Sequence, residues 1–176
     1  MERTYENGTL RLANVGEKVT LVGWVAKRRN LGSLVFIDLR DRSGIVQLTF
    51  DESIAEAVKD VRNEYILQVT GTVEKRKDAN PKIATGEIEI HVESVNIVNS
   101  AETAPITIAD DTDTSEDTRL KYRYLDLRRS VLQQNLILRH KVCMVARNVL
   151  DRQGFVEVET PILARSTPEG ARDYLV

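Results

Sequence analysis

The sequence contains only one cysteine, Cys143, and two histidines, His91 and His140. A single cysteine excludes an intrachain disulfide framework and a cysteine-based metal site, and the histidines lack the spacing of metal ligands. No stretch approaches the roughly 20 apolar residues of a membrane-spanning helix, and the polar start MERTYENGTL lacks the apolar core of a signal peptide. These absences predict a cytoplasmic protein with no membrane contact and no metal site.

The chain also lacks an excess of positive charge. Its 25 Lys and Arg residues are outnumbered by 27 Asp and Glu residues, so the net charge is −2. No overall basic field therefore predicts a nucleic-acid partner, and any such binding must come from a local patch. The hydrophobic fraction of 41% is sufficient for a packed core and argues against disorder for most of the chain.

Five stretches in the first hundred residues have the composition or alternation of β-strands, namely 18–28, 34–40, 44–50, 65–76 and 87–99. After the third stretch, Ile54, Val58 and Val61 recur at helical spacing behind a possible cap at Asp51 or Ser53. Three strands, one helix and two further strands are the order of an OB-fold barrel. The sequence therefore predicts a mainly β OB-fold, although a fold does not by itself define a function.

The composition changes after residue 100. Residues 101–118 include six acidic residues and no Lys or Arg, which indicates a hinge that ends in a helix start near Thr114 or Ser115. The apolar spacing predicts a longer helix over residues 130–153, stopped by Gly154. The alternating stretch FVEVETPIL then predicts a strand that contains Pro161. A helix followed by one strand cannot form a core, so this part is interpreted as incomplete.

The predicted barrel combines an aromatic ring, Phe36, and an amide, Gln47, with several cations: Lys27, Arg28, Arg29, Arg40 and Arg42. Single-stranded nucleic acids are bound by cations for phosphates, rings for stacking and polar groups for base edges. Alternation places Gln47 opposite Val46 and Leu48, on an exposed face. Glu89 also points away from the core, where it could accept a hydrogen bond from a base amino group.

Each of these residues also has a simpler interpretation. Phe36 could belong to the core, the arginines to a solvated rim, and Glu89 to an ordinary strand surface. Trp24 is expected in the core. The second half shows no Ser/His/Asp arrangement, no glycine-rich phosphate loop and no metal cluster. Its Glu169, Arg172 and Asp173 are, taken alone, most simply a charged loop.

The whole chain resembles the N-terminal part of the bacterial-type aspartyl-tRNA synthetases, which are class IIb aminoacyl-tRNA ligases. The resemblance rests on VTLVGWVAKRRNLGSLVFIDLRDRSGIVQLTF, ATGEIEI, RLKYRYLDLRR and GFVEVETPILARSTPEGARDYLV. It implies an OB-fold anticodon-binding domain over residues 1–103 and a hinge over 104–129. Residues 130–176 would be the truncated start of a class II antiparallel α+β catalytic domain, with the motif 1 helix and strand.

The resemblance also implies roles for residues of the barrel. Phe36 would stack on the middle anticodon base, Gln47 would contact the edge of that base, and Arg29 would support the same nucleotide. Glu89 would recognise the first letter. Two residues of the loop between the last two strands, Arg76 and Asn80, would approach the third letter.

Further roles follow from the same resemblance. Glu169 would meet the α-ammonium group of bound aspartate, and Pro161 with the preceding helix would form the interface of a homodimer. Leu31, together with Asn80, favours an enzyme that discriminates tRNA-Asp from tRNA-Asn.

For the full-length protein, the resemblance implies an aspartate–tRNA ligase that activates aspartate with ATP and Mg²⁺ and transfers it to tRNA-Asp. Motifs 2 and 3, which supply the ATP-binding arginines and Mg²⁺-binding acids, are absent from these 176 residues. The chain alone is therefore expected to be an inactive fragment that binds neither ATP nor Mg²⁺. Two alternatives remain: a non-discriminating or asparaginyl relative, and a non-catalytic OB-fold module that binds single-stranded nucleic acid.

Overall fold

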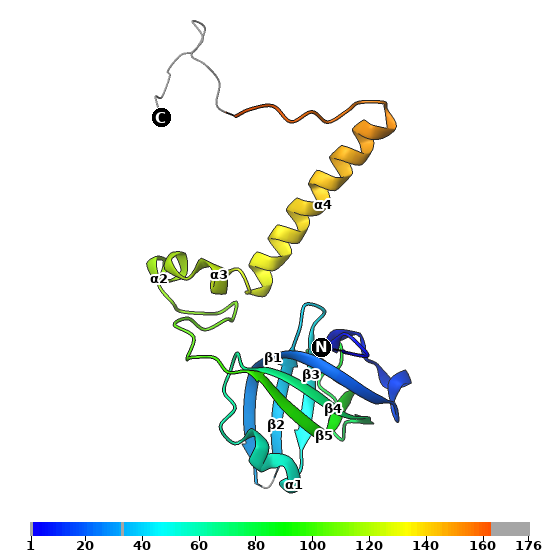
Figure 1. Ribbon diagram of the computed structural model, residues 1–176, viewed down its shortest axis with the longest axis vertical. Coiled ribbons are helices and arrows are strands. Elements are labelled where there is room, and N and C mark those ends of the chain that lie inside the picture. The colour runs from blue at the N-terminus through cyan, green and yellow to red at the C-terminus, as the bar shows by residue number, and fades with distance from the viewer. Residues whose placement is uncertain (1, 33, 163–176) are drawn as a thin grey trace, which may run out of the picture. The chain divides into compact units, whose positions relative to one another are not determined.

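The computed structural model describes residues 2–32 and 34–162 of the chain. The chain forms two compact units, residues 1–105 and 106–176. Figure 1 shows the elements of both units in chain order. Among the described residues, no helix has the length and hydropathy needed to cross a membrane.

The first unit is a closed five-stranded barrel, in which the strands are ordered β1-β2-β3-β5-β4. Its strands are β1 (Lys18–Leu31), β2 (Leu34–Arg40), β3 (Ile45–Phe50), β4 (Ile66–Lys75) and β5 (Ile88–Asn99). All neighbouring pairs are antiparallel except β3 and β5, which are parallel. This is the OB-fold that the sequence predicts.

Strand β1 is longer than predicted, because it pairs with two neighbouring strands. Its first half pairs with β4 from Lys18 to Trp24, and its second half pairs with β2 from Trp24 to Leu31. The register shifts between Val25 and Lys27, and such a bulge bends a strand and increases its twist. The bend lets a single strand close the barrel.

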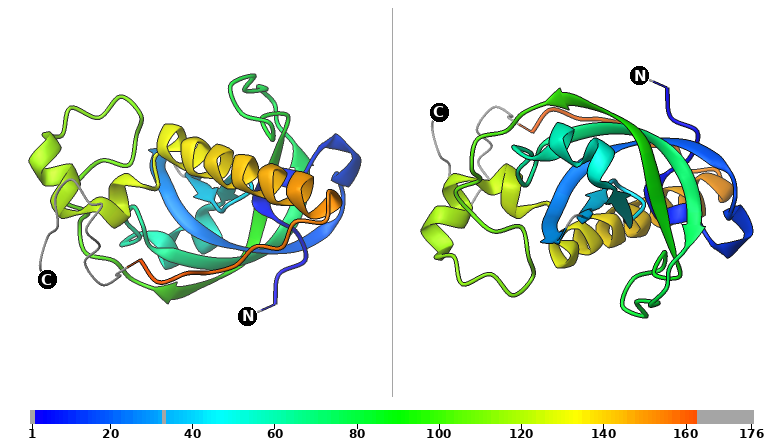
Figure 2. Two further views of the ribbon diagram at one scale, coloured as in Figure 1. Left: turned by 90° about the horizontal axis from the view of Figure 1, so that it is seen from above. Right: turned by 90° about the horizontal axis from the view of Figure 1, so that it is seen from below.

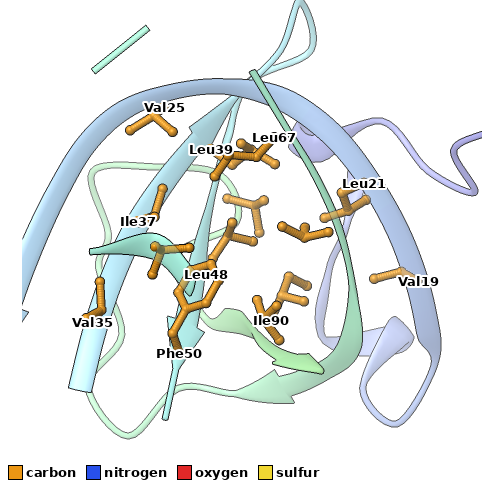
Figure 3. Packing of buried hydrophobic residues seen from close by; sticks show 14 of the residues in the cluster. Val19, Leu21, Val25, Val35, Ile37, Leu39, Leu48, Phe50, Leu67 and Ile90 are labelled. Carbon is orange, nitrogen blue, oxygen red and sulfur yellow. The ribbon is translucent and has the colours of Figure 1, made fainter. Parts of the chain in front are cut away.

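Inward-facing side chains alternate along the strands and fill the barrel (Figure 3). Among the described residues, Phe50 is the only aromatic one with a fully buried side chain, and it packs with aliphatic residues from every strand. Trp24 is half-buried and lies on the opposite face of β1 from Val25, so the prediction that it belongs to the core is wrong. The inward position beside it belongs to Gly23, where a Cβ atom would lie 2.5 Å from the carbonyl oxygen of Arg40.

The predicted helix between β3 and β4 is present but shorter than its apolar spacing suggests. It consists of α1 (Glu52–Ala55) and a 3-10 turn, η3 (Glu56–Val58), and lies across one end of the barrel (Figure 2). The Asp51 side chain caps α1 by accepting a hydrogen bond from the Ser53 backbone N–H at 3.0 Å. Val58 and Val61 are buried and join the barrel core. Two further 3-10 turns, η1 (Asn7–Thr9) and η2 (Leu12–Asn14), precede β1.

The described part of the second unit, up to residue 162, contains three helices: α2 (Glu116–Lys121), α3 (Arg123–Asp126) and α4 (Ser130–Arg152). Helix α4 ends with Gly154 at a φ of 85°, where the backbone N–H groups of Gly154 and Phe155 donate to the carbonyls of Asp151 and Leu150. This pattern is a Schellman cap, which requires a left-handed residue that glycine adopts without strain. The predicted helix and its stop are therefore both observed.

The strand predicted from Phe155 onward is not observed in the described residues up to Ile162, which corrects that expectation. The apolar side chains of this stretch are exposed rather than buried. A strand exists only when a neighbour supplies its hydrogen bonds, and no described residue pairs with this segment. Instead, Glu157 accepts three hydrogen bonds from the Arg147 guanidinium of α4: two from Nε, at 2.9 and 3.1 Å, and one from Nη2, at 3.1 Å.

Candidate nucleic-acid interface

One outer face of the barrel carries a row of side chains contributed by four strands. Strand register places Arg29 of β1 opposite Phe36 of β2, Phe36 opposite Thr49 of β3, and Thr49 opposite His91 of β5. Phe36 lies between the buried Val35 and Ile37, so its ring points away from the core and is half-buried on this face. The structure therefore does not support the interpretation of Phe36 as a core residue.

Gln47 is at the centre of a hydrogen-bonded network on this face. Its Oε1 accepts from Nη2 of Arg29 at 3.2 Å, and its Nε2 donates to Oε2 of Glu89 at 2.7 Å. The same Arg29 Nη2 donates to Oδ1 of Asp38 at 2.6 Å, and the Thr49 hydroxyl donates to Glu89 Oε2 at 3.0 Å. Gln47, Arg29 and Glu89, three residues singled out from the sequence, are thus in direct contact.

The position of Gln47 corrects one part of the prediction. Its side chain does lie opposite Val46 and Leu48, but only 5% of the residue is exposed. Burial is possible because both ends of its amide have hydrogen-bond partners, and a buried polar group without them is costly. A ligand that hydrogen-bonds with Gln47 must therefore meet a side chain already held in one orientation, which lowers the entropy cost of binding.

The cations around the face differ in their availability. Nη2 of Arg40 donates to both carboxylate oxygens of Glu64, at 2.9 and 3.0 Å, so Arg40 is committed to an internal ion pair. Arg29 is held by Asp38, as described above. Lys27 and Arg42 are exposed. The basic character predicted from the sequence is therefore reduced within the fold, and Arg40 belongs to the structure rather than to a phosphate-binding rim.

The loop between β4 and β5 projects from the barrel (Figure 2) and carries Arg76 and Asn80. The Arg76 N–H donates to the carbonyl of Glu87 at 3.0 Å, and the Asn80 N–H donates to the carbonyl of Gly86 at 2.9 Å. Oδ1 of Asn80 accepts from the Lys82 N–H at 3.0 Å. A Cβ atom at Gly86 would lie 1.8 Å from the Asn80 carbonyl oxygen, so the loop requires glycine there.

The remaining predicted residues are not brought to this network. Leu31 is exposed at the end of β1, and Pro161 is exposed after α4. Glu169 lies outside the described residues. Among the described residues, no group of three or more His, Cys, Asp or Glu side chains is arranged to hold a metal ion.

The sequence analysis assigned no role to His91, because the two histidines lack the spacing of metal ligands. In the structure, His91 lies in the same row as Thr49 and Phe36. Its Nε2 is 3.7 Å from Oδ2 of Asp51. The pKa of the Asp51 carboxyl is lowered, chiefly by the Ser53 hydroxyl and in smaller part by His91. The pKa of Glu93 is lowered as well, first by its hydrogen bond with Lys18 and then by that with Thr72. Alternation along β5 was the signal that could have placed His91 on this face.

Two family models match the chain, one in each of its two compact units. Residues 19–98 match the OB-fold nucleic acid binding domain of the tRNA anticodon type, and residues 115–176 match the class II tRNA synthetases for D, K and N. The chain therefore combines an OB-fold domain with part of a class II synthetase domain.

Individual relatives define the family further. The chain is 56% identical over its whole length to the aspartate–tRNA ligase of Ruminiclostridium cellulolyticum. It is 55% identical, over 99% of its length, to the aspartate–tRNA(Asp/Asn) ligase of Geobacillus sp. (strain WCH70). Over its whole length, the chain is thus similar to part of these aspartate–tRNA ligases. It spans 30% of the length of each of these two curated relatives.

Among solved structures, asparaginyl-tRNA synthetase from Pyrococcus horikoshii, complexed with asparaginyl-adenylate, is similar with a TM-score of 0.82 and 28% identity. The similarity covers 97% of this chain and 39% of that one. It supports the OB-fold and the class II assignment of the two units.

Proposed function

We propose that the protein acts as an aspartate–tRNA ligase in which the outer face of the barrel binds the anticodon of tRNA-Asp. The observation that carries this proposal is the contact of Arg29, Gln47 and Glu89 beside the outward ring of Phe36. These residues combine a stacking surface with donors and acceptors for base edges, which is how proteins recognise single-stranded RNA loops. The similarity of the whole chain to bacterial aspartate–tRNA ligases supports the same function.

Within this proposal, each residue has a distinct task. Phe36 stacks on the middle anticodon base, while Gln47, held by Arg29, hydrogen-bonds with the edge of that base. Glu89 accepts a hydrogen bond from the guanine-type first letter, because a carboxylate can pair with base amino groups but repels phosphates. Arg76 and Asn80, on the projecting loop, approach the third letter.

The chemistry belongs to the whole protein rather than to the barrel. Aspartate and ATP, with Mg²⁺, give aspartyl-adenylate, and the aspartyl group is then transferred to the end of tRNA-Asp. We place ATP and Mg²⁺ binding in parts of the protein beyond these 176 residues, and we assign Glu169 to the α-ammonium of aspartate. The proposed divisions are an anticodon domain over 1–103, a hinge over 104–129 and the start of the catalytic domain over 130–176. A cytoplasmic homodimer completes the proposal.

The choice between tRNA-Asp and tRNA-Asn is a separate part of the proposal. Two relatives of nearly equal identity carry the names of an aspartate–tRNA ligase and of an aspartate–tRNA(Asp/Asn) ligase. Overall similarity therefore does not separate the two activities. We assign the discriminating activity to this protein on the basis of Leu31 and Asn80.

The proposal is tested by binding of the 176-residue chain to RNA hairpins that carry the tRNA-Asp anticodon loop, at one stated salt concentration. Changing the middle letter should weaken binding by about 5- to 150-fold, which corresponds to the roughly 1–3 kcal/mol of a lost base contact. Gln47→Ala should remove that preference. The matched control is Gln68→Ala, since Gln68 lies on β4 outside the network and donates to the Glu2 carbonyl.

Two results would contradict anticodon recognition by this face. One is equal binding of all hairpins with a steep dependence on salt, which is the behaviour of a non-specific single-strand binder. The other is an unchanged middle-letter preference in the Gln47→Ala variant. Tight binding of a hairpin with the tRNA-Asn anticodon would instead overturn only the assignment made from Leu31 and Asn80.

A further inference from the structure

A partly exposed histidine, His91, lies on the outer face of β5. His91 lies between Ile90 and Val92, both buried in the core, so its imidazole points outward. Its side chain is 40% exposed and is in register with Thr49 of β3 and Thr72 of β4. It therefore continues the row formed by Arg29, Phe36 and Thr49.

The charges on this face are divided between its two sides. Lys27 and Arg29 lie on this face of β1, whereas carboxylates surround His91 on the other side. Asp51 lies 3.7 Å from the imidazole, Glu89 and Glu93 lie two residues away on either side, and Lys18 is paired with Glu93 at 2.6 Å. Phosphates are repelled by such a group of carboxylates. A nucleotide at His91 would therefore present its base to the protein and keep its phosphate away.

The direction of the RNA follows from the two contacts assigned above. The middle letter lies over Phe36 and Gln47 on β2 and β3, and the first letter lies at Glu89 on β5. Moving from β2 towards β5 thus runs from 3′ to 5′ along the RNA. His91 is two residues from Glu89 along β5, on the same face and about 7 Å away, so an RNA strand that turns along β5 after the first letter reaches it.

Resting on this proposed function, we propose that His91 is a further base-contacting residue, which stacks on the nucleotide that precedes the first anticodon letter. Histidine is among the rings on which unstacked bases stack in protein–RNA complexes. Oδ2 of Asp51 lies 3.7 Å from Nε2, beyond hydrogen-bond distance, so the ring is not fixed by a hydrogen bond with that carboxylate.

The test is binding of the 176-residue chain to two hairpins at fixed salt: the intact anticodon loop, and the same loop with an abasic site at the preceding nucleotide. His91→Ala should weaken binding of the intact loop by about fivefold or more, as loss of one base stack does. The unchanged protein should bind the abasic loop more weakly than the intact loop. The His91→Ala variant should bind the abasic loop with the same affinity as the unchanged protein does. His91→Phe should bind the intact loop about as tightly as the unchanged protein.

His140→Ala is the matched control, because His140 is the only other histidine and lies on α4 in the second unit. It should bind both loops as the unchanged protein does. The inference is overturned if His91→Ala binds the intact loop normally, or if it loses the same factor with both loops. It is also overturned if His91→Gln retains affinity while His91→Phe does not, since the contact is then a hydrogen bond. Failure of anticodon recognition itself would appear separately, as equal binding of all letter variants by the unchanged protein.

Discussion

At the scale of single residues, the outer face of the barrel is held together by polar side chains that satisfy one another. Arg29 bridges Asp38 and Gln47, and Glu89 accepts from both Gln47 and Thr49. The Gln47 amide, the Thr49 hydroxyl and Nη2 of Arg29 therefore have partners before RNA arrives, whereas Nε of Arg29 is buried without one. Binding must exchange some of these hydrogen bonds for contacts with bases, so affinity depends on how well a base replaces the partner that it displaces.

A carboxylate beside this network offers a direct electrostatic test. Glu93 accepts from Nζ of Lys18 at 2.6 Å and from the Thr72 hydroxyl at 3.0 Å, and both hydrogen bonds lower its pKa below the ordinary value of 4.5. Because the folded-state pKa is lowered, its stabilising contribution is present above the unfolded pKa and is lost as pH falls through the folded one. Carboxyl NMR titration should show a depressed Glu93 pKa that Lys18→Ala moves back towards 4.5. An unchanged pKa in that variant would mean that Lys18 does not act on Glu93.

At the scale of elements, alternation and helical spacing were sufficient to predict the five strands, the α1 region and helix α4. These patterns depend on which side chains face the core, and that is a local property of each strand or helix. The burial of Gln47 could not be predicted this way, because it depends on Arg29 and Glu89, which lie on other strands. The strand predicted from Phe155 failed for a related reason, since alternation cannot supply a partner strand.

A buried carboxylate holds the connection between α3 and α4. Asp126 is fully buried and accepts from Arg123 at 2.5 Å and from Arg129 at 3.1 Å. Arg129 also donates to the Asp110 carbonyl at 3.0 Å, and the Asp110 carboxylate accepts from the Val131 N–H at the start of α4. This network links the acidic segment, α3 and α4 within the second unit.

Asp126→Asn tests that network. The substitution keeps the shape of the side chain but removes its charge from between two guanidinium groups, and breaking a buried ion pair costs about 3–5 kcal/mol. We expect faster amide hydrogen exchange at Val131 and through the first turn of α4. Asp111→Asn is the control, because Asp111 is exposed. Equal protection in both variants would show that Asp126 does not hold the start of α4.

At the scale of the whole molecule, α4 carries an apolar stripe that no described residue covers. Val131, Leu138, Val142, Val145 and Val149 are between 46% and 62% exposed. The apolar spacing that predicted the helix also predicted this stripe. Whether the stripe is buried depends on the surface that packs against it, and the spacing of residues along one helix does not specify that surface. A contiguous exposed apolar surface of this kind is typical of an interface.

The proposed homodimer makes a second copy the partner of this stripe. Sedimentation equilibrium of the chain should then show a mass that rises with concentration from 19.9 kDa towards twice that value. Val142→Asp should keep the chain monomeric, because a dimer would bury an unpaired carboxylate in its interface. Gln133→Glu also adds one negative charge to α4, but on the face of the helix opposite the stripe, so it should leave association unchanged. A monomer at every concentration, or equal effects of the two variants, would exclude α4 as the contact between copies of this chain.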